Sequence, residues 1–348
     1  MTAAGTAEAG AERERLFGLL WGFFPAQLLR TLAQLGVPDA LADGPADVTT
    51  LAARTGTHPP SLRRLLTAGV GLQLVTAAGD DRYELAPAGH LLRTGAPGSL
   101  GNLAQLFCGD ATWRAWGELG WSVRTGAPSF EKVTGRTAFA HIAADPTLSA
   151  VFTEAMAEGT RAGAPAIVAA CDLDGAGTLC DVGGGNGTLL AAFLAARPEL
   201  RGVLFDTADG LGDAATVLAG VADRCRIEAG DFFAEVPSCD AYVVKSVVHD
   251  WDDDRATALL ARIRAAAPPN AALFLVEPVL PADPAELTQV PTMLMSDLNM
   301  LVCTGGRERT AADFTALLVA AGWRLVDVAP TERHGYSVLR AAPDRPRE

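Results

Sequence analysis

The stretch LCDVGGGNGTLL (residues 179–190) decides the fold. A short apolar run ends at Asp181 and leads into a glycine-rich bend, and a helical pattern, TLLAAFLAARP, begins at Thr188. Glycines let the backbone approach a ligand closely, and a bend between a strand and a helix is where open α/β sheets bind nucleotides. The sequence therefore predicts that a ligand containing a nucleoside binds at this bend.

The spacing of the glycines separates two kinds of cofactor. A dinucleotide site has the pattern G-x-G-x-x-G, whose last glycine lets the helix pack near the pyrophosphate. Counting from Gly183, that place is held by Thr188. The acid Asp181 is instead followed by glycine at every second position, at Gly183, Gly185 and Gly187. This spacing favours a methyl donor without a pyrophosphate, whose amino-acid end meets Asp181, over a nicotinamide cofactor.

Short β-rich runs alternate with helical stretches after Thr178. These runs are LCDV, GVLFD, CRIEA, AYVVKSVV and ALFLVEPV, followed by a final pair, WRLVDVAP and GYSVLRAA. Strands of Val, Leu, Ile and Phe without polar alternation are buried on both faces, as crossover helices require. The sequence therefore predicts a Rossmann-like α/β domain with a parallel sheet, whose ligands bind at the carboxyl ends of the strands.

Two acids at the ends of strands are candidate contacts to a nucleoside. The second strand ends at Asp206, about twenty residues after the glycines, where a carboxylate can accept both ribose hydroxyls. The alternative role for Asp206 is a helix N-cap. The third strand ends at Gly230-Asp231-Phe232, which offers an acceptor for an adenine amino group beside an aromatic face. Core packing would explain the phenylalanine alone, but not Asp231.

The N-terminal part of the chain has a different pattern. Apolar residues recur with helical spacing over residues 16–35, and later segments predict helix, turn, helix and a short hairpin. This order predicts a mostly helical winged-helix domain over residues 1–105. Residues 106–348 are then expected to form a helical linker followed by the catalytic Rossmann-like domain.

A winged helix can bind DNA or mediate dimerisation. Its second helix offers only Arg63 and Arg64 for contacts to DNA, which is few for such a role. The formal net charge of −13 also argues against a nucleic-acid partner, because a phosphate backbone requires clustered Lys and Arg. Dimerisation is therefore the preferred interpretation, and the expected ligand is a small molecule.

The composition predicts a cytoplasmic, globular protein. Of 348 residues, 49% are hydrophobic and 20% are charged, which is enough apolar mass for sizeable cores. The six cysteines are scattered without framework spacing, as expected of reduced thiols. Residues 13–29 resemble a signal peptide, but acids interrupt them and no cleavage site follows, so an amphipathic helix is expected. No run reaches the roughly 18 apolar residues that span a bilayer, and no membrane partner is predicted.

The run KSVVHDWDDD (residues 245–254) makes a family resemblance specific. With DVGGGNG and GDFF before it and LFLVEPVLP and GGRERT after it, the chain resembles the plant and actinobacterial small-molecule O-methyltransferases over nearly its whole length. The resemblance implies a Rossmann-like class I methyltransferase domain with an N-terminal winged-helix dimerisation domain, and hence a homodimer. It implies S-adenosylmethionine as methyl donor, S-adenosylhomocysteine as product, and the phenolic hydroxyl of a small aromatic specialised metabolite as acceptor.

The resemblance also implies which residues are catalytic. His249 is the implied general base, with Glu277 and Glu308 beside its imidazole. A phenol titrates at about 10, and a histidine at about 6.5 can take its proton as the methyl group arrives. Carboxylates orient such a ring and stabilise the imidazolium that forms. From the residues alone, His249 could equally be a capping or core histidine, and Glu308 could be a surface ion pair.

The resemblance places Lys245 and Ser246 along the cofactor, and one departure affects the ribose ligand. The family usually continues the second strand as Asp-Leu-Pro, whereas this chain has Asp-Thr-Ala-Asp-Gly at residues 206–210. Asp209 is therefore the alternative to Asp206. The acidic residues Asp250 and Asp252 to Asp254 are expected at a helix N-terminus, where they suit the dipole.

Residues that could contact the acceptor are aromatic, methionine or polar side chains, with core packing as the alternative for each. Aromatic and methionine side chains fill irregular gaps around flat rings. The family pattern points to the segment from Trp113 to Trp121 and to Phe152, Met156, Met293, Asp297, Asn299 and Met300.

No metal site is predicted, because the five histidines lack ligand spacing, although separation in sequence does not exclude clustering in space. Methylation of carbon or nitrogen and a member of the fold repurposed for another reaction remain alternatives to O-methylation. A winged-helix transcription regulator that uses the methyl donor as a signal is the more distant alternative, together with a nicotinamide oxidoreductase.

Overall fold

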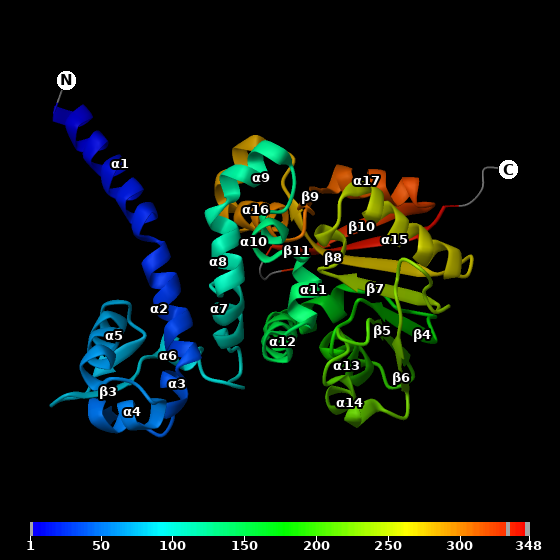
Figure 1. Cartoon of the computed structure of the whole chain (residues 1–348). Helices are drawn as coiled ribbons and strands as arrows, with labels where there is room; N and C mark the ends of the chain where they lie inside the picture. Colours follow the sequence, from blue (N-terminus) through cyan, green and yellow to red (C-terminus); the bar gives the residue numbers. More distant parts are fainter. Residues whose placement is uncertain (1–2, 332–334, 345–348) are drawn as a thin grey trace. The chain divides into compact units, whose positions relative to one another are not determined.

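The computed structural model describes residues 3–331 and 335–344 (Figure 1). The chain divides into two compact units, residues 1–110 and residues 111–348. Each unit has its own hydrophobic core and is described by itself.

The first unit is mostly helical and carries a small antiparallel sheet. Strand β3 pairs with β1 on one side and with β2 on the other. The helix, turn, helix and hairpin that the sequence predicts are present as α4, α5, β2 and β3. The elements are α1 (Ala3–Trp21), α2 (Phe23–Gln34), α3 (Val37–Ala40), β1 (Ala46–Asp47), α4 (Val48–Thr55), α5 (Pro59–Gly71), β2 (Val75–Ala77), β3 (Arg82–Leu85), α6 (Pro87–His90) and α7 (Gly101–Phe107).

The core of the first unit lies among α2, α4 and α5. Leu32, Leu51, Leu62 and Leu66 come from these three helices and are almost completely buried. The apolar spacing that predicts one helix over residues 16–35 is realised as two helices, because Gly22 interrupts them. Pro25 has no backbone N–H to donate to the carbonyl of Trp21, four residues earlier, which together with the poor helix propensity of Gly22 accounts for the position of the break.

Helix α1 and the start of α2 expose large apolar side chains. Phe17, Leu20, Trp21 and Phe24 recur at the spacing of one helical face, and each is at least 49% exposed. Leu20 is the most exposed of them, at 72%. A contiguous exposed apolar stripe of this kind is typical of an interaction surface.

The same segment corrects one prediction from the sequence. Among the described residues, the stretch Gly10–Gln34 is long and apolar enough, by length and composition alone, to cross a membrane. The sequence-based prediction that no run reaches this length was wrong, because it counted consecutive apolar residues. The leucines and phenylalanines raise the mean hydropathy of the stretch although polar residues interrupt it.

The second unit consists of helices followed by an α/β sheet with helices on both faces (Figure 1). Its N-terminal helices are α8 (Asp110–Gly117), α9 (Leu119–Thr125), α10 (Ser129–Thr134), α11 (Ala138–Ala143) and α12 (Pro146–Ala170). The α/β part contains β4 (Thr178–Val182), α13 (Thr188–Ala196), β5 (Arg201–Asp206), α14 (Ala214–Val217), η1 (Ala219–Val221), β6 (Cys225–Ala229), β7 (Ala241–Lys245), η2 (Val248–Asp250), α15 (Asp253–Ala266), β8 (Ala272–Leu280), η3 (Pro284–Gln289), α16 (Pro291–Cys303), β9 (Arg309–Thr310), α17 (Ala311–Ala320), β10 (Trp323–Pro330) and β11 (Tyr336–Pro343).

The sheet has the order β10-β11-β8-β7-β4-β5-β6, and β9 pairs with β8 outside this path. Strands β4 to β8 are parallel, as predicted, but β11 is antiparallel to both β8 and β10. The prediction of a parallel sheet was therefore wrong for β11, which runs opposite to both of its neighbours. Consecutive strands joined by a short turn have to be antiparallel, whereas parallel neighbours need a long crossover.

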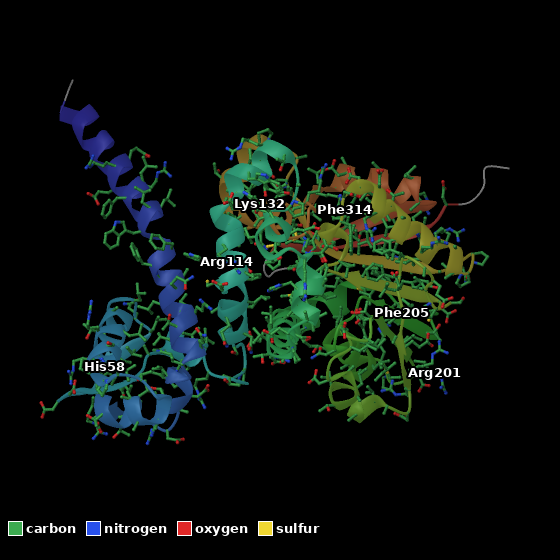
Figure 2. The ribbon with its side chains drawn as sticks, in the orientation of Figure 1. His58, Arg114, Lys132, Arg201, Phe205 and Phe314 are labelled. Carbon is green, nitrogen blue, oxygen red and sulfur yellow. The ribbon has the colours of Figure 1, made fainter. Side chains whose placement is uncertain are left out.

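Two cores cover the two faces of the sheet. On one face, Tyr242 and Val244 of β7 pack with α15 and α17, and Phe205 and Phe314, both labelled in Figure 2, belong to this core. On the other face, Val243 packs with α13, where Phe193 is completely buried. Strand β6 is the exception to the predicted burial on both faces, because it is the exposed edge of the sheet.

Candidate active site

The turn that follows β7 carries His249 into the interior. Ser246 has a φ of 53°, in the left-handed region, and there the chain leaves the strand. The backbone N–H groups of Val247 and Val248 then donate to Oε1 of Glu277, at 3.0 and 2.8 Å. The carboxylate thus caps the start of η2, where His249 is only 8% exposed.

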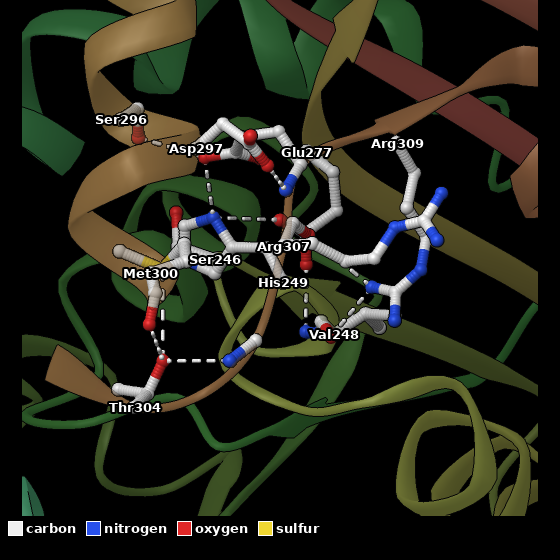
Figure 3. Close-up of polar contacts among 12 residues, drawn as sticks. Ser246, Val248, His249, Glu277, Ser296, Asp297, Met300, Thr304, Arg307 and Arg309 are labelled. Carbon is white, nitrogen blue, oxygen red and sulfur yellow. Dashed lines mark hydrogen bonds and ion pairs between the residues drawn. The ribbon is translucent and has the colours of Figure 1, made fainter. Parts of the chain in front are cut away.

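The Nδ1 atom of His249 faces two buried carboxylates that are distant in sequence, of which Glu277 is labelled in Figure 3. Its Nδ1 is 3.1 Å from Oε1 of Glu308 and 3.6 Å from Oε2 of Glu277. The structure therefore brings together the three residues implied as catalytic. Glu277 lies inside β8 rather than at its end, because the strand continues to Leu280, and Glu308 is buried rather than a surface ion pair.

Helix α16 holds the second carboxylate. The Ser296 hydroxyl donates to Oε1 of Glu308 at 2.7 Å, and the backbone N–H of Glu308 donates to Oδ1 of Asp297 at 2.9 Å. Asp297, expected at the acceptor, therefore anchors the segment that carries Glu308. Ser296 was missed by the sequence analysis, since nothing in the sequence separates it from the other polar residues of its helix.

The carboxylates make His249 a stronger base. Burial alone lowers the pKa of His249, but the charge of Glu277 and the hydrogen bond to Glu308 outweigh burial and raise it to about 10. In the described part of the chain, Oε2 of Glu277 and Oε2 of Glu308 accept no hydrogen bond. The cluster thus has more carboxylate oxygens than hydrogen-bond donors, and this excess of negative charge favours the protonated ring.

Asp250 does not lie at the N-terminus of α15, where the sequence predicted it. It lies in η2, where burial raises its pKa to about 7, and the nearby Glu277 and Glu308 add to the shift. The N-cap of α15 is Asp252, which accepts from the backbone N–H of Arg255 at 2.8 Å. The prediction holds for Asp252 to Asp254 and was wrong for Asp250.

The glycine-rich bend forms a backbone cradle at the carboxyl end of β4. Gly183, Gly185 and Gly187 all have positive φ, between 57° and 80°. A Cβ on Gly183 would lie 2.8 Å from Val247, so this position is closed to larger residues. Behind the bend, Asp181 is almost completely buried, and burial, with a smaller contribution from Asp206, raises its pKa to about 7.

Of the two candidate ribose ligands, the structure places Asp206 beside this bend. Oδ2 of Asp206 accepts from the backbone N–H of Gly185 at 2.8 Å, whereas Asp209 is exposed. After the next strand, Oδ1 of Asp231 accepts from the N–H of Phe233 at 2.8 Å. The rings of Phe232 and Phe233 lie 4.8 Å apart, centroid to centroid.

Lys245 and Ser246 form a polar group with Tyr336. The Lys245 ammonium donates to the Ser246 hydroxyl at 3.2 Å and lies 5.1 Å from the centre of the Tyr336 ring. The two hydroxyls of Ser246 and Tyr336 are 2.8 Å apart. Burial lowers the pKa of Lys245. Tyr336 was missed by the sequence analysis, because its strand joins the sheet next to β8 only in the folded structure.

The residues expected at the acceptor lie on α8, α9, α12 and α16. Asn299 accepts from the indole N–H of Trp116 at 2.9 Å, and Met293 and Met300 are buried on the same helix. Phe152 packs edge-on against Phe139. Met156 is partly buried, and Trp113 is 37% exposed.

Matches to known proteins identify the family. A family model described as an O-methyltransferase domain matches residues 116–324, and one described as an O-methyltransferase dimerisation domain matches residues 17–95. The chain belongs to the O-methyltransferase family. It is an S-adenosylmethionine-dependent enzyme with the class I methyltransferase fold and an N-terminal, mostly helical dimerisation domain.

Two curated relatives and two solved structures illustrate the likeness. The enzyme is similar to O-demethylpuromycin-O-methyltransferase of Streptomyces alboniger, with 40% identity covering 97% of this chain and 90% of the relative. It is also similar to 8-amino-8-demethylriboflavin N,N-dimethyltransferase of Streptomyces davaonensis, with 38% identity covering 88% of each. The LaPhzM structure aligns with a TM-score of 0.90 and 38% identity over 95% of this chain and 99% of that chain. Human N-acetylserotonin methyltransferase in complex with SAM aligns with a TM-score of 0.87 and 27% identity over 96% of this chain and 98% of that chain.

The bend of the O-methyltransferase fits its methyl donor. Oδ2 of Asp181 is buried and has no hydrogen-bond partner among the described residues, which suits an ammonium group such as that of the donor's amino-acid end. The three positive-φ glycines leave backbone without side chains in front of it. Both observations agree with a ligand that approaches the backbone closely.

The structure also bears on the prediction about metals. The ligand atoms of His249, Glu277 and Glu308 all lie within 4.8 Å of one another, although the residues are distant in sequence. These three side chains cluster in space although their spacing in the sequence is unlike that of a metal site. Its donors are ones that a divalent cation can also use.

Gly306 provides a test of how tightly the site is built. A Cβ at Gly306 would lie 2.0 Å from the carbonyl oxygen of His249 and 2.5 Å from the backbone carbon of Asp250. Backbone atoms cannot move aside as a flexible side chain can, so we expect Gly306→Ala to displace His249. Turnover should fall by on the order of a hundredfold, with a loss of about 1–3 kcal/mol in stability.

The measurements are kcat and the thermal unfolding midpoint. Gly220→Ala is the matched control, since a Cβ there meets no atom within 4 Å and the residue has no positive φ. A Gly306→Ala enzyme with the turnover of the control would show that η2 is not held in this way.

Proposed function

We propose that the enzyme transfers the methyl group of S-adenosylmethionine to a phenolic hydroxyl of a small aromatic metabolite, with His249 as general base. The observation that supports this most is the pairing of His249 Nδ1 with Glu308 and Glu277. Nδ1 faces carboxylates and therefore carries a proton in either state of the ring. Nε2, for which no hydrogen bond to a described residue is found, is the nitrogen left to accept the proton of the acceptor.

The basicity of His249 matches this task. A phenol has an ordinary pKa of about 10, and the carboxylates raise the pKa of His249 to about 10 as well. Proton transfer from a phenol to this ring is therefore close to balanced, whereas an ordinary imidazole would be a much weaker base than the phenolate. The consequence is that turnover should increase with pH over the neutral range.

S-adenosylmethionine supplies a methyl group already activated on a sulfonium. The contribution left to the protein is to align the acceptor oxygen with that methyl group and to remove the hydroxyl proton. We assign donor binding to the bend and the strand ends around it. These residues are Asp181, Gly183, Gly185, Gly187, Asp206, Gly230, Asp231, Phe232, Lys245 and Ser246.

Within the donor site, charge and hydrogen-bonding capacity separate the roles. The unpartnered oxygen of Asp181 suits the ammonium group, and Asp206, rather than the exposed Asp209, suits the ribose hydroxyls. Asp231 beside Phe232 suits the adenine. For the acceptor we assign Phe152, Met156, Met293 and Asn299, with Trp113 at the exposed margin and Asp297 acting through its bond to Glu308.

Methylation of nitrogen is a second candidate, because one relative at 38% identity is an N,N-dimethyltransferase. An arylamine attacks with its own lone pair and needs no proton removed beforehand, so it would depend little on His249. A phenol and the arylamine with the same ring therefore separate the two activities.

We further propose that the enzyme is a homodimer that buries the apolar stripe on α1 and the start of α2. Phe17, Leu20, Trp21 and Phe24 are exposed within the unit that matches the dimerisation domain. A second copy of the same face would remove these side chains from water.

The first prediction concerns His249. We expect His249→Ala to reduce kcat for a phenolic acceptor by about 10²- to 10⁴-fold, the usual contribution of a general base. Donor affinity should stay within a few-fold, because the glycine-rich bend is unchanged. The measurements are methyl transfer from isotope-labelled donor and calorimetric donor binding, with the exposed His58→Ala as control. Equal loss of transfer and of donor binding would contradict the role.

The second prediction concerns pH. The base acts when neutral, so turnover rises as pH passes the pKa of His249, which the charge of Glu277 raises. Glu277→Gln keeps an oxygen for the N–H groups of Val247 and Val248 but removes that charge. We expect the rise in kcat to move to lower pH by about one unit or more.

The pH profile of kcat measures this shift, and Glu286→Gln, in η3 and outside the cluster, is the control. A profile that moves to higher pH, or does not move, would show that Glu277 does not set the basicity of His249.

The third prediction concerns assembly. Replacing Phe17 and Leu20 together by Glu places two charges on the exposed stripe and should convert the dimer to a monomer. Light scattering after size-exclusion chromatography gives the mass, and Glu14→Gln on the same exposed helix is the control. An unchanged dimer mass would place the interface elsewhere.

A further inference from the structure

The side chain of Arg309 is completely buried beside the turn that carries His249 (Figure 3). Nη1 donates to the carbonyl oxygen of Val248 at 3.1 Å, and Nη2 donates to that of Trp251 at 2.8 Å. Nε and Nη2 also contact Oδ1 of Asp253, at 3.0 and 2.7 Å. One guanidinium therefore joins the carbonyls on both sides of His249 and Asp250.

The backbone of the neighbouring residues also bonds to this turn. The N–H of Arg307 donates to the carbonyl oxygen of His249 at 2.9 Å. The segment of residues 307–309 thus supplies donors to the carbonyls of Val248, His249 and Trp251. Glu308, between the two arginines, bonds to the imidazole itself. The same short segment holds the backbone of the base and its ring.

The ion pair with Asp253 does not explain why Arg309 is buried. The Asp253 side chain is 55% exposed, and exposed ion pairs contribute little to stability. Arg307 gives the comparison, because it also pairs with Asp253, at 3.6 Å, while its own side chain remains 46% exposed. The buried guanidinium is accounted for by its bonds to the carbonyls of the turn.

We propose that Arg309 is a positioning residue for the methyl transfer, which fixes the His249 ring against Glu308 and Glu277. The proposal rests on the proposed role of His249 as general base. A planar guanidinium can bridge two carbonyls at a fixed distance, whereas a single ammonium cannot. Loss of the bridge frees η2, and Nδ1 moves away from the carboxylates that raise the pKa of the ring.

The test is Arg309→Lys, which keeps the positive charge beside Asp253 and removes the planar guanidinium. We expect kcat to fall by about tenfold to a hundredfold, as for a misplaced catalytic group, with the KM for S-adenosylmethionine changed by less than about threefold. We also expect the rise of kcat with pH to move to lower pH. A variant that is only less folded would lose amplitude without moving the profile.

Arg224→Lys is the matched control. Arg224 also donates to several carbonyls, those of Leu194, Arg197 and Leu200, but around the end of α13 rather than at η2. This variant should lose stability and leave the pH profile in place. An Arg309→Lys profile that coincides with that of Arg224→Lys would overturn the proposal.

A direct measurement covers the case in which activity is too low to follow. The chain has five histidines, so NMR of protein labelled at the imidazole ¹³Cε1 can follow each ring through its titration, with His249→Ala giving the assignment. The proposal expects the His249 resonance to titrate at lower pH in Arg309→Lys than in the unaltered enzyme. An unchanged titration overturns it. If His249→Ala retains turnover, the general-base assignment fails, while this titration still shows whether Arg309 positions the ring.

Discussion

The carboxylate of Glu277 is the interaction on which the site depends. One of its oxygens accepts the N–H groups of Val247 and Val248, and the other faces the Nδ1 atom of His249. Glu277 lies in β8, where it pairs with Ser337 of β11, and the preceding residue, Val276, pairs with Lys245 of β7. The sheet therefore fixes both the direction in which the chain leaves β7 and the electrostatic environment of the imidazole.

The second carboxylate reaches the ring by another route. Just before Glu308, the backbone at Gly306 lies directly against the peptide of His249. Ser296 and Asp297 of α16 bond to the side chain and the backbone of Glu308. His249 and the two carboxylates thus come from three separate segments, each anchored by its own backbone contacts. A cluster with unpartnered carboxylate oxygens is costly to bury, and such a framework is what keeps it assembled.

Much of this could be predicted from the sequence, and the limits have physical reasons. The glycine spacing after Asp181 and the strand-like runs indicate the α/β fold, because backbone access and burial leave local patterns. The direction of β11 leaves no such local pattern, since its pairing with β8 joins residues about sixty positions apart along the chain. Arg309 and Arg307 look alike in sequence, and only tertiary packing buries one and exposes the other.

The same limit applies to the candidate site. His249, Glu277 and Glu308 could be named only through the family resemblance, because no spacing rule connects residues drawn together by folding. Tyr336 and Ser296 were missed for that reason. Asp250 was misplaced, because an acidic run before a helix gives no sign of which member enters the interior.

The separate anchoring of the base has a consequence for how such enzymes diversify. Phe152 and Met156 belong to α12, and the hydrogen bonds found for His249, Glu277 and Glu308 among the described residues come from other elements. Under the proposed function, substitutions of these two residues would change which ring is accommodated and leave the surroundings of His249 as they are. Helix α16 lacks this freedom, because Ser296 and Asp297 bond to the segment of Glu308 while Met293 and Asn299, which we assign to the acceptor, lie on the same helix. The proposed function therefore implies that selectivity evolves more easily through α12 than through α16.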